Sequence, residues 1–244
     1  MNGGMNKVGL ALGGAVLVVA GVAIAWGWEG PPTKTERTDR VEAAVQHVDI
    51  DNDSGQVFVT SADVTETVVE QRITYRGDDP GRTFRVDGST LLLHGCGPDC
   101  SVGYEVTVPL GVEVTGRVSS GDIVVEGTGN VDVRANSGNV ELRLRGAERV
   151  SAVVDSGDVD VDLDDVAEVE ARASSGNVDL DLVGVDVVRA EASSGDITAT
   201  VPRGAYRVRA STDSGHQDVS GDDPNAERVL ELTTSSGDVT VRGT

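Results

Sequence analysis

A short turn sequence, Ser-Gly followed in most copies by Asp or Asn, recurs along the C-terminal half of the chain. An earlier, degenerate copy is Asp53-Ser54-Gly55. Successive glycines of the later copies are 17, 19, 19, 19, 20 and 22 residues apart, and they are Gly121, Gly138, Gly157, Gly176, Gly195, Gly215 and Gly237. A unit of this length cannot bury an apolar face alone, so the spacing predicts that like units stack on one another.

Apolar residues occupy the same positions in nearly every unit. Residues two, four and six after the glycine are mostly aliphatic, as in the VDLDL stretch at 178–182. Residues seven, five and three before it are smaller, as in the VEARA stretch at 169–173. A two-residue period is typical of strands that bury one face. The pattern therefore predicts that each unit consists of two short strands joined by the Ser-Gly turn.

Even spacing with identical turns predicts an all-β fold, a parallel β-solenoid of short stacked rungs of about 19 residues each. An antiparallel sandwich is the alternative, but it does not predict such regular spacing. We expect the solenoid at 48–244, with regular repeats at 119–244 and irregular N-terminal rungs and a cap at 48–118. The turn at Asp78–Gly81 is a candidate hairpin. Because the chain ends one strand after its last turn, we expect the last rung to present an open edge.

An uncharged run of 21 residues extends from Val8 to Trp28. This length spans a bilayer as a helix, which predicts one N-terminal transmembrane helix at 8–28. Lys7 precedes the run and Glu29 follows it, so residues 1–7 are expected in the cytoplasm and the rest outside. The alternative is a cleaved signal peptide, because Ala23-Ile24-Ala25 has the small-x-small form of a cleavage site.

Residues 29–47 are rich in Pro, Thr and charged side chains and have no strong apolar period. We expect them to be a linker between the membrane and the domain. The predicted localisation is the cell membrane, single-pass, with the C-terminal domain outside the cytoplasm.

The composition narrows the choice of partners. The formal net charge is −21, and such an acidic surface repels phosphate backbones, so no nucleic-acid partner is expected. Aromatic residues make up only 3% of the chain, so the core must consist mainly of aliphatic side chains and sugar binding by aromatic stacking is not favoured.

The chain has two cysteines, Cys96 and Cys100, separated by a Gly-Pro-Asp turn. Outside the cytoplasm, a close pair is expected to form one disulfide. A zinc site that includes His94 is the alternative, but structural zinc sites usually take four ligands and no second cysteine pair is present. The disulfide is the favoured interpretation, and no metal or other cofactor is predicted.

These features together resemble a known family. A membrane run, two cysteines before SVGYEVTVPLGVEVT, and serial SSGDI, NSGNV, DSGDV, SSGNV and SSGDV motifs resemble the bacterial envelope proteins called putative adhesins, a β-strand-repeat domain of unknown function. The resemblance covers about residues 48–244. It implies a β-solenoid outside the membrane, some relatives connected with envelope stress responses, and no catalytic residues. This chain departs from the pattern at His216 and Gln217, which predicts irregular packing in that rung.

Acidic residues occupy outward positions in two successive units. Stacking places Asp160 over Asp179 and Asp162 over Asp181, where a divalent cation would relieve the repulsion between them. These four residues form a speculative cation-binding ladder. The simpler interpretation is that the carboxylates are solvated and prevent aggregation. We favour it because the nonapeptide calcium pattern GGxGxD is absent from the sequence.

The turns carry acids as well, at Asp122, Asp158, Asp196 and Asp238. Asn139 and Asn177 occupy the same place in other units, which favours a role in turn formation over cation binding.

Catalysis has little support in the sequence. The three histidines, His47, His94 and His216, lie far apart in the repeat scheme, and no catalytic residues are predicted. Polysaccharide lyases with β-helical folds are an analogy from fold alone.

We therefore expect a non-enzymatic, membrane-anchored extracytoplasmic putative adhesin that acts as an envelope scaffold or protein-interaction surface. Its partner would be an envelope protein, not identified by the sequence, or another copy of the chain. The alternatives are a calcium-dependent polysaccharide-binding module and a polysaccharide-degrading enzyme.

Overall fold

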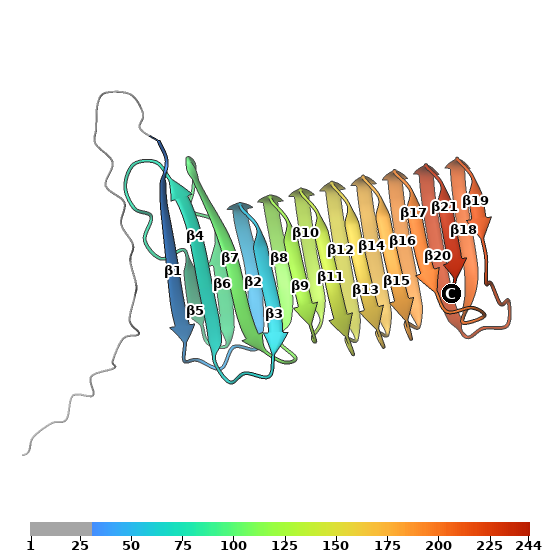
Figure 1. Cartoon of the computed structure of the whole chain (residues 1–244), viewed down its shortest axis with the longest axis horizontal. Coiled ribbons are helices and arrows are strands. Elements are labelled where there is room, and N and C mark those ends of the chain that lie inside the picture. Colours follow the sequence, from blue (N-terminus) through green and yellow to red (C-terminus); the bar gives the residue numbers. More distant parts are fainter. Residues whose placement is uncertain (1–30) are drawn as a thin grey trace, which may run out of the picture.

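The computed structural model describes residues 31–244. In this part of the chain all regular structure is β-strand, arranged as two long sheets (Figure 1). None of the described residues belongs to a helix with the length and hydropathy needed to cross a membrane. The helix expected at Val8–Trp28 lies outside the described residues.

Sheet A has eleven strands. In spatial order they are β1 (Thr33–Val41), β4 (Thr67–Tyr75), β7 (Cys100–Pro109), β3 (Val57–Ala62), β9 (Ile123–Gly127), β11 (Val140–Arg145), β13 (Val159–Asp164), β15 (Val178–Val183), β17 (Ile197–Val201), β21 (Val239–Gly243) and β19 (Gln217–Val219).

Sheet B has ten strands. In spatial order they are β18 (Tyr206–Ser214), β20 (Arg228–Ser236), β16 (Val187–Ser194), β14 (Glu168–Ser175), β12 (Arg149–Ser156), β10 (Val131–Ser137), β8 (Glu113–Ser120), β2 (His47–Ser54), β6 (Thr90–His94) and β5 (Phe84–Asp87).

Each rung contributes one strand to each sheet, and like positions of successive rungs lie side by side. In sheet A, for example, Val159 pairs with Val178 and Val161 with Leu180. Pairing is parallel except in three pairs, β1 with β4, β4 with β7 and β5 with β6. The expected all-β fold is confirmed, and the long parallel sheets fit the predicted solenoid rather than an antiparallel sandwich.

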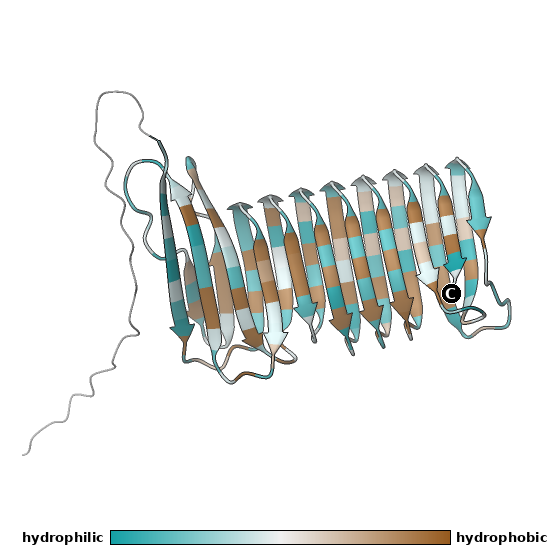
Figure 2. Ribbon diagram, in the orientation of Figure 1, coloured by the Kyte–Doolittle hydropathy of each residue, from teal (hydrophilic) through white to brown (hydrophobic). Residues whose placement is uncertain are grey.

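The core lies between the two sheets. The aliphatic columns predicted from the repeat face inward and are buried, as are Val178, Leu180 and Leu182 in β15 and Ala171 in β14. Figure 2 shows the resulting alternation of hydrophobic and hydrophilic residues along the strands of the middle rungs. Because the core of the middle rungs is thin and regular, small aliphatic side chains fill it, whereas the buried aromatic residues Tyr75, Phe84, Tyr104 and Tyr206 lie towards the two ends of the stack.

The glycine of each turn is required by close stacking of the backbone. Gly176 has a φ of 143°, and a Cβ atom at this position would lie 1.9 Å from the carbonyl oxygen of Gly157 in the rung below. No other residue fits this conformation and this approach. The same contact recurs along the column of turn glycines, which explains why the Ser-Gly step is repeated.

The Asp or Asn after each glycine satisfies the backbone of the next turn. Its Oδ1 atom accepts a hydrogen bond from the backbone N–H of the equivalent residue in the adjacent rung, for example from Asn177 to Asp158 at 2.8 Å. The ladder continues through Asp122, Asn139, Asp158, Asn177, Asp196, Asp238 and ends at His216. Since no rung follows His216, this last position needs no acceptor, and a histidine is tolerated there.

The expected linker at 29–47 is wrong over residues 33–41, because these residues form β1. This strand pairs antiparallel with β4 along the edge of sheet A. Only Thr35 and Val41 of β1 are buried. The segment therefore has almost no apolar pattern, although it completes the fold through backbone hydrogen bonds.

Two expectations for 48–118 also need correction. First, this segment is not irregular throughout, because β2 and β3 form an ordinary rung around the degenerate Ser54-Gly55 turn, and this rung pairs in parallel with β8 and β9. Second, Asp78–Gly81 is not a hairpin turn but connects β4 in sheet A to β5 in sheet B. Because β1 and β7 already occupy both sides of β4, the next strand cannot pair with it and instead pairs with β6.

The C-terminal rung does not form the open edge that we expected. Strands β20 and β21 insert between β16–β17 and β18–β19, so the rung that precedes them in sequence is the last in space (Figure 1). That edge rung has polar residues, Thr212 and Gln217, at inward positions, whereas Leu230 and Leu232 of the inserted rung are buried. Placing the polar rung at the edge leaves the apolar one covered on both sides.

Candidate functional site

The four aspartates singled out by the sequence lie together on the outer surface of sheet A. Asp160 pairs with Asp179 and Asp162 with Asp181 across β13 and β15, and all four side chains are exposed. None of the four takes part in an ion pair within residues 31–244. We call this group, Asp160, Asp162, Asp179 and Asp181, the acidic face.

No neighbouring arginine forms an ion pair with the acidic face, although Arg143 attracts Asp160 at longer range. Arg143 is beside Asp162 in the register of β11 and β13. Its guanidinium instead pairs with Glu126 at 2.8 Å and with Glu141, which together raise the pKa of Arg143. On the other side, Asp179 pairs with an uncharged residue of β17. The negative charge of the face is thus left to the solvent or to a ligand.

The titration of Asp179 reflects this crowding. Partial burial raises the pKa of Asp179 above its usual value, and the carboxylate of Asp160 raises it further. A hydrogen bond from Thr198 and the positive charge of Arg242 lower this pKa and so act in the opposite direction. The ionised form of Asp179 is therefore disfavoured in the fold, and a nearby cationic group would relieve the repulsion.

The outer surface of sheet B differs, because its acids and bases alternate. Arg189 lies between Glu168 at 3.1 Å and Glu231 at 3.4 Å, and Arg209 contacts the same Glu231 at 2.6 Å. Arg172 contacts Glu191 at 3.0 Å. These residues form a chain of exposed ion pairs from rung to rung, so this part of sheet B largely satisfies its own charges.

No metal centre is built into the described chain. Within residues 31–244, no three His, Cys, Asp or Glu side chains converge closely enough to hold a metal ion. The acidic face is flat, so its carboxylates lie beside one another rather than around a common point.

The two cysteines are joined in a disulfide, with their Cα atoms 5.5 Å apart. Because both sulfurs are bonded to each other, neither is available as a thiolate ligand for the zinc site considered with His94. The disulfide closes the turn immediately before β7, beside the N-terminal end of the core.

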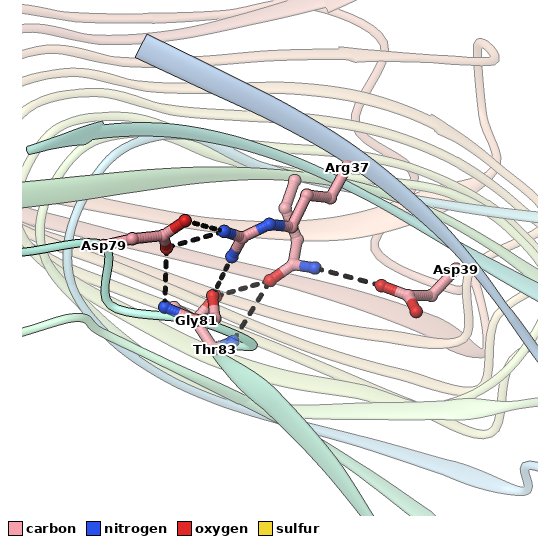
Figure 3. A network of polar contacts seen from close by, with 6 residues as sticks. Arg37, Asp39, Asp79, Gly81 and Thr83 are labelled. Atoms are coloured by element: carbon pink, nitrogen blue, oxygen red, sulfur yellow. Dashed lines mark hydrogen bonds and ion pairs between the residues drawn. The ribbon is translucent and has the colours of Figure 1, made fainter. Parts of the chain in front are cut away.

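A polar network that the sequence did not reveal closes the N-terminal end (Figure 3). Arg37 of β1 binds both carboxylate oxygens of Asp79, at 2.5 and 2.6 Å, and also contacts the carbonyl oxygen of Gly81. The hydrogen bond from Arg37 lowers the pKa of Asp79, and a backbone N–H from Gly81 lowers it further. This contact holds the connection between β4 and β5 against the edge strand.

The network continues into the core beneath that connection. The Oε1 atom of buried Gln71 accepts hydrogen bonds from the backbone N–H and the hydroxyl of Thr83. The hydroxyl of Tyr104 lies 2.6 Å from the carbonyl oxygens of both Thr83 and His94. Burial raises the pKa of Tyr104 to about 12. These contacts tie sheet A to sheet B at the N-terminal end of the stack.

The ion pairs of sheet B were also missed, although a signal for them exists in the sequence. The residues six before the turn glycine are Glu170, Arg189, Glu231 and Arg209 in successive spatial rungs. The sign of the charge alternates down this column, which is the sequence signal for the ion pairs. By contrast, the N-terminal network does not repeat and leaves no periodic signal.

Comparison with known proteins gives one family match. The family model described as Toastrack DUF4097 matches residues 37–242. No curated protein matches the chain significantly.

Solved structures are similar to this chain at low identity. A protein from Bacteroides fragilis called a putative adhesin is 15% identical, with 88% of this chain and 99% of that chain covered and a TM-score of 0.55. A protein from Parabacteroides distasonis called a putative lipid binding protein is 15% identical, with 84% and 96% covered and a TM-score of 0.46. The first of these supports a common fold.

Proposed function

The chain belongs to the Toastrack DUF4097 family, and from that premise we propose that it is a non-enzymatic, membrane-anchored scaffold of the cell envelope, whose acidic face binds a basic segment of another envelope protein. The solenoid supplies a rigid surface, the N-terminal run supplies the anchor, and the aspartates of β13 and β15 supply the recognition.

One observation carries this proposal, namely that the charges of the acidic face are not paired whereas those on the outer surface of β14, β16, β18 and β20 are paired with one another. Arginines and glutamates of sheet B contact one another. The four carboxylates of the acidic face have no ion-pair partner in the described chain. Like charges on adjacent strands are destabilising, so a ligand that brings positive charge gains more on sheet A than on sheet B. An extended segment with Lys or Arg at alternate positions has the spacing to match the alternate acids along one strand, Asp160 with Asp162 or Asp179 with Asp181.

The anchor proposal has a geometric consequence. Since β1 begins at Thr33, only residues 29–32 separate it from the end of the apolar run at Trp28. Extended chain covers at most about 3.6 Å per residue, so the N-terminal end of the solenoid would lie within about 18 Å of the bilayer. The N-terminal end of the domain would be held close to the membrane, whereas the acidic face lies on β13 and β15, six and seven strands further along sheet A.

The experiment uses site-specific photocrosslinking of the full chain in intact cells. Val183 is 50% exposed and follows Asp181 on the outer surface of β15. A photoreactive residue at this position is expected to crosslink a specific membrane or envelope protein. The double variant Asp160→Asn with Asp179→Asn, tested with the same photoreactive residue, is expected to abolish the crosslinked product. The matched control is Glu170→Gln with Glu191→Gln, which removes two carboxylates from sheet B and is expected to leave the crosslink unchanged.

A photoreactive residue at Val153, on the outer surface of sheet B, tests the choice of face. Equal crosslinking from Val153 and Val183, or a product that survives the two aspartate substitutions, would contradict the proposal. A thermal melt with millimolar calcium completes the test. A rise in melting temperature that the aspartate variant lacks would assign the acidic face to a cation instead.

A further inference from the structure

The outer surface of sheet B is hollowed where β2, β8 and β10 lie side by side. The hollow has a volume of about 420 Å³, and its lining includes Ile50 and Gly116, which are paired across β2 and β8. The side chain of Ile50 is buried and glycine has none, so the floor is main chain. Gly116 has a φ of 125°, and a Cβ atom there would lie 2.0 Å from the carbonyl oxygen of Ile50, so this close approach requires glycine. We call this hollow the sheet B cleft.

Charged side chains line the sheet B cleft in two short rows. Asp49 and Asp132 lie in one row, with Thr115 between them. Arg117 and Arg134 lie side by side in the next row. Two residues along a strand separate the rows, which is about 7 Å. The cleft therefore has an anionic side and a cationic side within reach of one small molecule.

The cationic row contains one arginine that the fold does not use. Arg117 contacts Asp51 at 3.1 Å. Arg134 has Arg117 on one side and the apolar Val153 on the other, and it forms no ion pair within residues 31–244. Because an adjacent like charge is destabilising, an anionic group bound at Arg134 would be favoured.

The anionic row contains two carboxylates without a charged partner. Asp132 is exposed and lies between Thr115 and Ser151, and Asp49 is half-buried and lies between Leu92 and Thr115. Neither carboxylate forms an ion pair in the part of the chain that the structure describes. These two positions therefore favour cationic groups.

The unpaired charges of the cleft select one kind of ligand. They are two negative charges, of Asp49 and Asp132, and one positive charge, of Arg134. A ligand with positive charge alone would be repelled by Arg117 and Arg134, and an anion alone would be repelled by the aspartates. The complementary ligand has two ammonium groups and one carboxylate, and the cleft lies within the range of about 300–1,000 Å³ that is typical of small-molecule sites.

We propose that the sheet B cleft binds a diamino acid of the size of lysine. Its carboxylate binds Arg134, and its two ammonium groups bind Asp49 and Asp132. The main chains of β2 and β10 are two strand spacings apart, about 10 Å, and this distance suits two ammonium groups on one short aliphatic chain that lies across β8. The site is separate from the acidic face, which lies on the other sheet, so this inference does not rest on the proposed function.

The experiment is equilibrium dialysis of the full chain in detergent micelles against radiolabelled lysine. We expect saturable binding of one lysine per chain with a Kd below about 10 mM. Arg134→Gln and Asp132→Asn should each weaken the binding by about tenfold, because each removes a charge-assisted hydrogen bond. Asp155→Asn is the matched control, since Asp155 is exposed on β12 of the same surface and does not line the cleft. This variant should bind lysine as the wild-type protein does.

Two competitors test the need for both kinds of charge. Norleucine lacks the side-chain ammonium group and cadaverine lacks the carboxylate, so both should displace labelled lysine at least about tenfold less well than unlabelled lysine does. Equal competition by cadaverine would overturn the proposal, because the signal would then be general attraction of a cation to an acidic protein.

Absence of saturable binding, or binding that survives both cleft substitutions, would also overturn the proposal. The double variant Asp160→Asn with Asp179→Asn should bind lysine normally, and loss of binding in this variant would assign the ligand to the acidic face instead. The crosslink from Val183 is measured independently of lysine binding, so failure of either proposal is recognised separately.

Discussion

The middle of the solenoid and its N-terminal end are stabilised in different ways (Figure 1). From β8 to β17 all strands pair in parallel. One hydrogen bond at the turn is repeated throughout, in which the side-chain Oδ1 of each Asp or Asn accepts from the backbone N–H of the equivalent residue in the next rung. At the N-terminal end three strand pairs are antiparallel, and the buried side chains of Gln71, Thr83 and Tyr104 form a hydrogen-bond network that does not repeat along the stack.

The difference shows that extending a stack and closing it need different interactions. A middle rung is held by backbone contacts that any similar rung can make. The end of the stack has to satisfy sheet edges that would otherwise pair with another chain, and it does so with antiparallel strands and specific side chains. Substitutions in the two regions should therefore fail for different reasons.

The largest effect is expected from Gly176→Ala in the middle. The new Cβ atom would lie 1.9 Å from the carbonyl oxygen of Gly157, so the rungs must separate. We expect a loss of about 3–5 kcal/mol in the free energy of unfolding, measured by denaturant titration. Gly204→Ala is the matched control, because Gly204 also has a positive φ, of 68°, but no atom within 4 Å of the added Cβ. It should lose only about 1–2 kcal/mol. Equal losses would show that backbone conformation, not stacking, requires the glycine.

A smaller effect is expected from Tyr104→Phe at the N-terminal end. The substitution removes the hydroxyl contacts with Thr83 and His94 and should lower the free energy of unfolding by about 1–3 kcal/mol at neutral pH.

Alkaline titration sharpens this test. Because the pKa of Tyr104 is raised from 10.0 to about 12, its contribution to stability is complete below pH 10 and is lost as the pH rises towards 12. The wild-type protein should lose part of its stability over this range, and Tyr104→Phe should lose less. An unchanged pH profile in the variant would mean that Tyr104 does not link the two sheets.

The smallest effect is expected from Asp179→Asn on the acidic face. The raised pKa of Asp179 means that the protonated form is favoured in the fold. The contribution of protonated Asp179 to the free energy of unfolding is complete below pH 3.8, and it is lost as the pH rises through the raised pKa of the folded protein.

At pH 7 the amide should therefore stabilise the protein slightly, by less than about 1 kcal/mol, with no gain at pH 3. Asp164→Asn is the control, because Asp164 lies 3.6 Å from Arg145 and loses an attraction rather than a repulsion. Thermal melts at the two pH values measure both variants, and a gain for Asp164→Asn as large as that for Asp179→Asn would contradict the role of local repulsion.

Much of the fold was predictable because the same residue types recur at the same offsets. The alternation at 178–182 indicated which side chains face inward, and the repeat period placed Asp160 beside Asp179 and Asp162 beside Asp181, as observed. Strand β1 was not predictable in this way. It lies at an edge, buries only two of its side chains, and is held by backbone hydrogen bonds that every sequence can make.

The sequence by itself determined the rung, its inward columns and its Gly-Asp turn, because these follow from a two-residue period and from contacts that only glycine permits. Only the tertiary structure decided the order of the rungs at both ends. Neighbouring rungs join through nearly identical backbone hydrogen bonds, so the spacing of turns is compatible with more than one order. The choice depends on which rung can be exposed, and the polar side chains of Thr212 and Gln217 place β18 and β19 at the edge while Leu230 and Leu232 are covered.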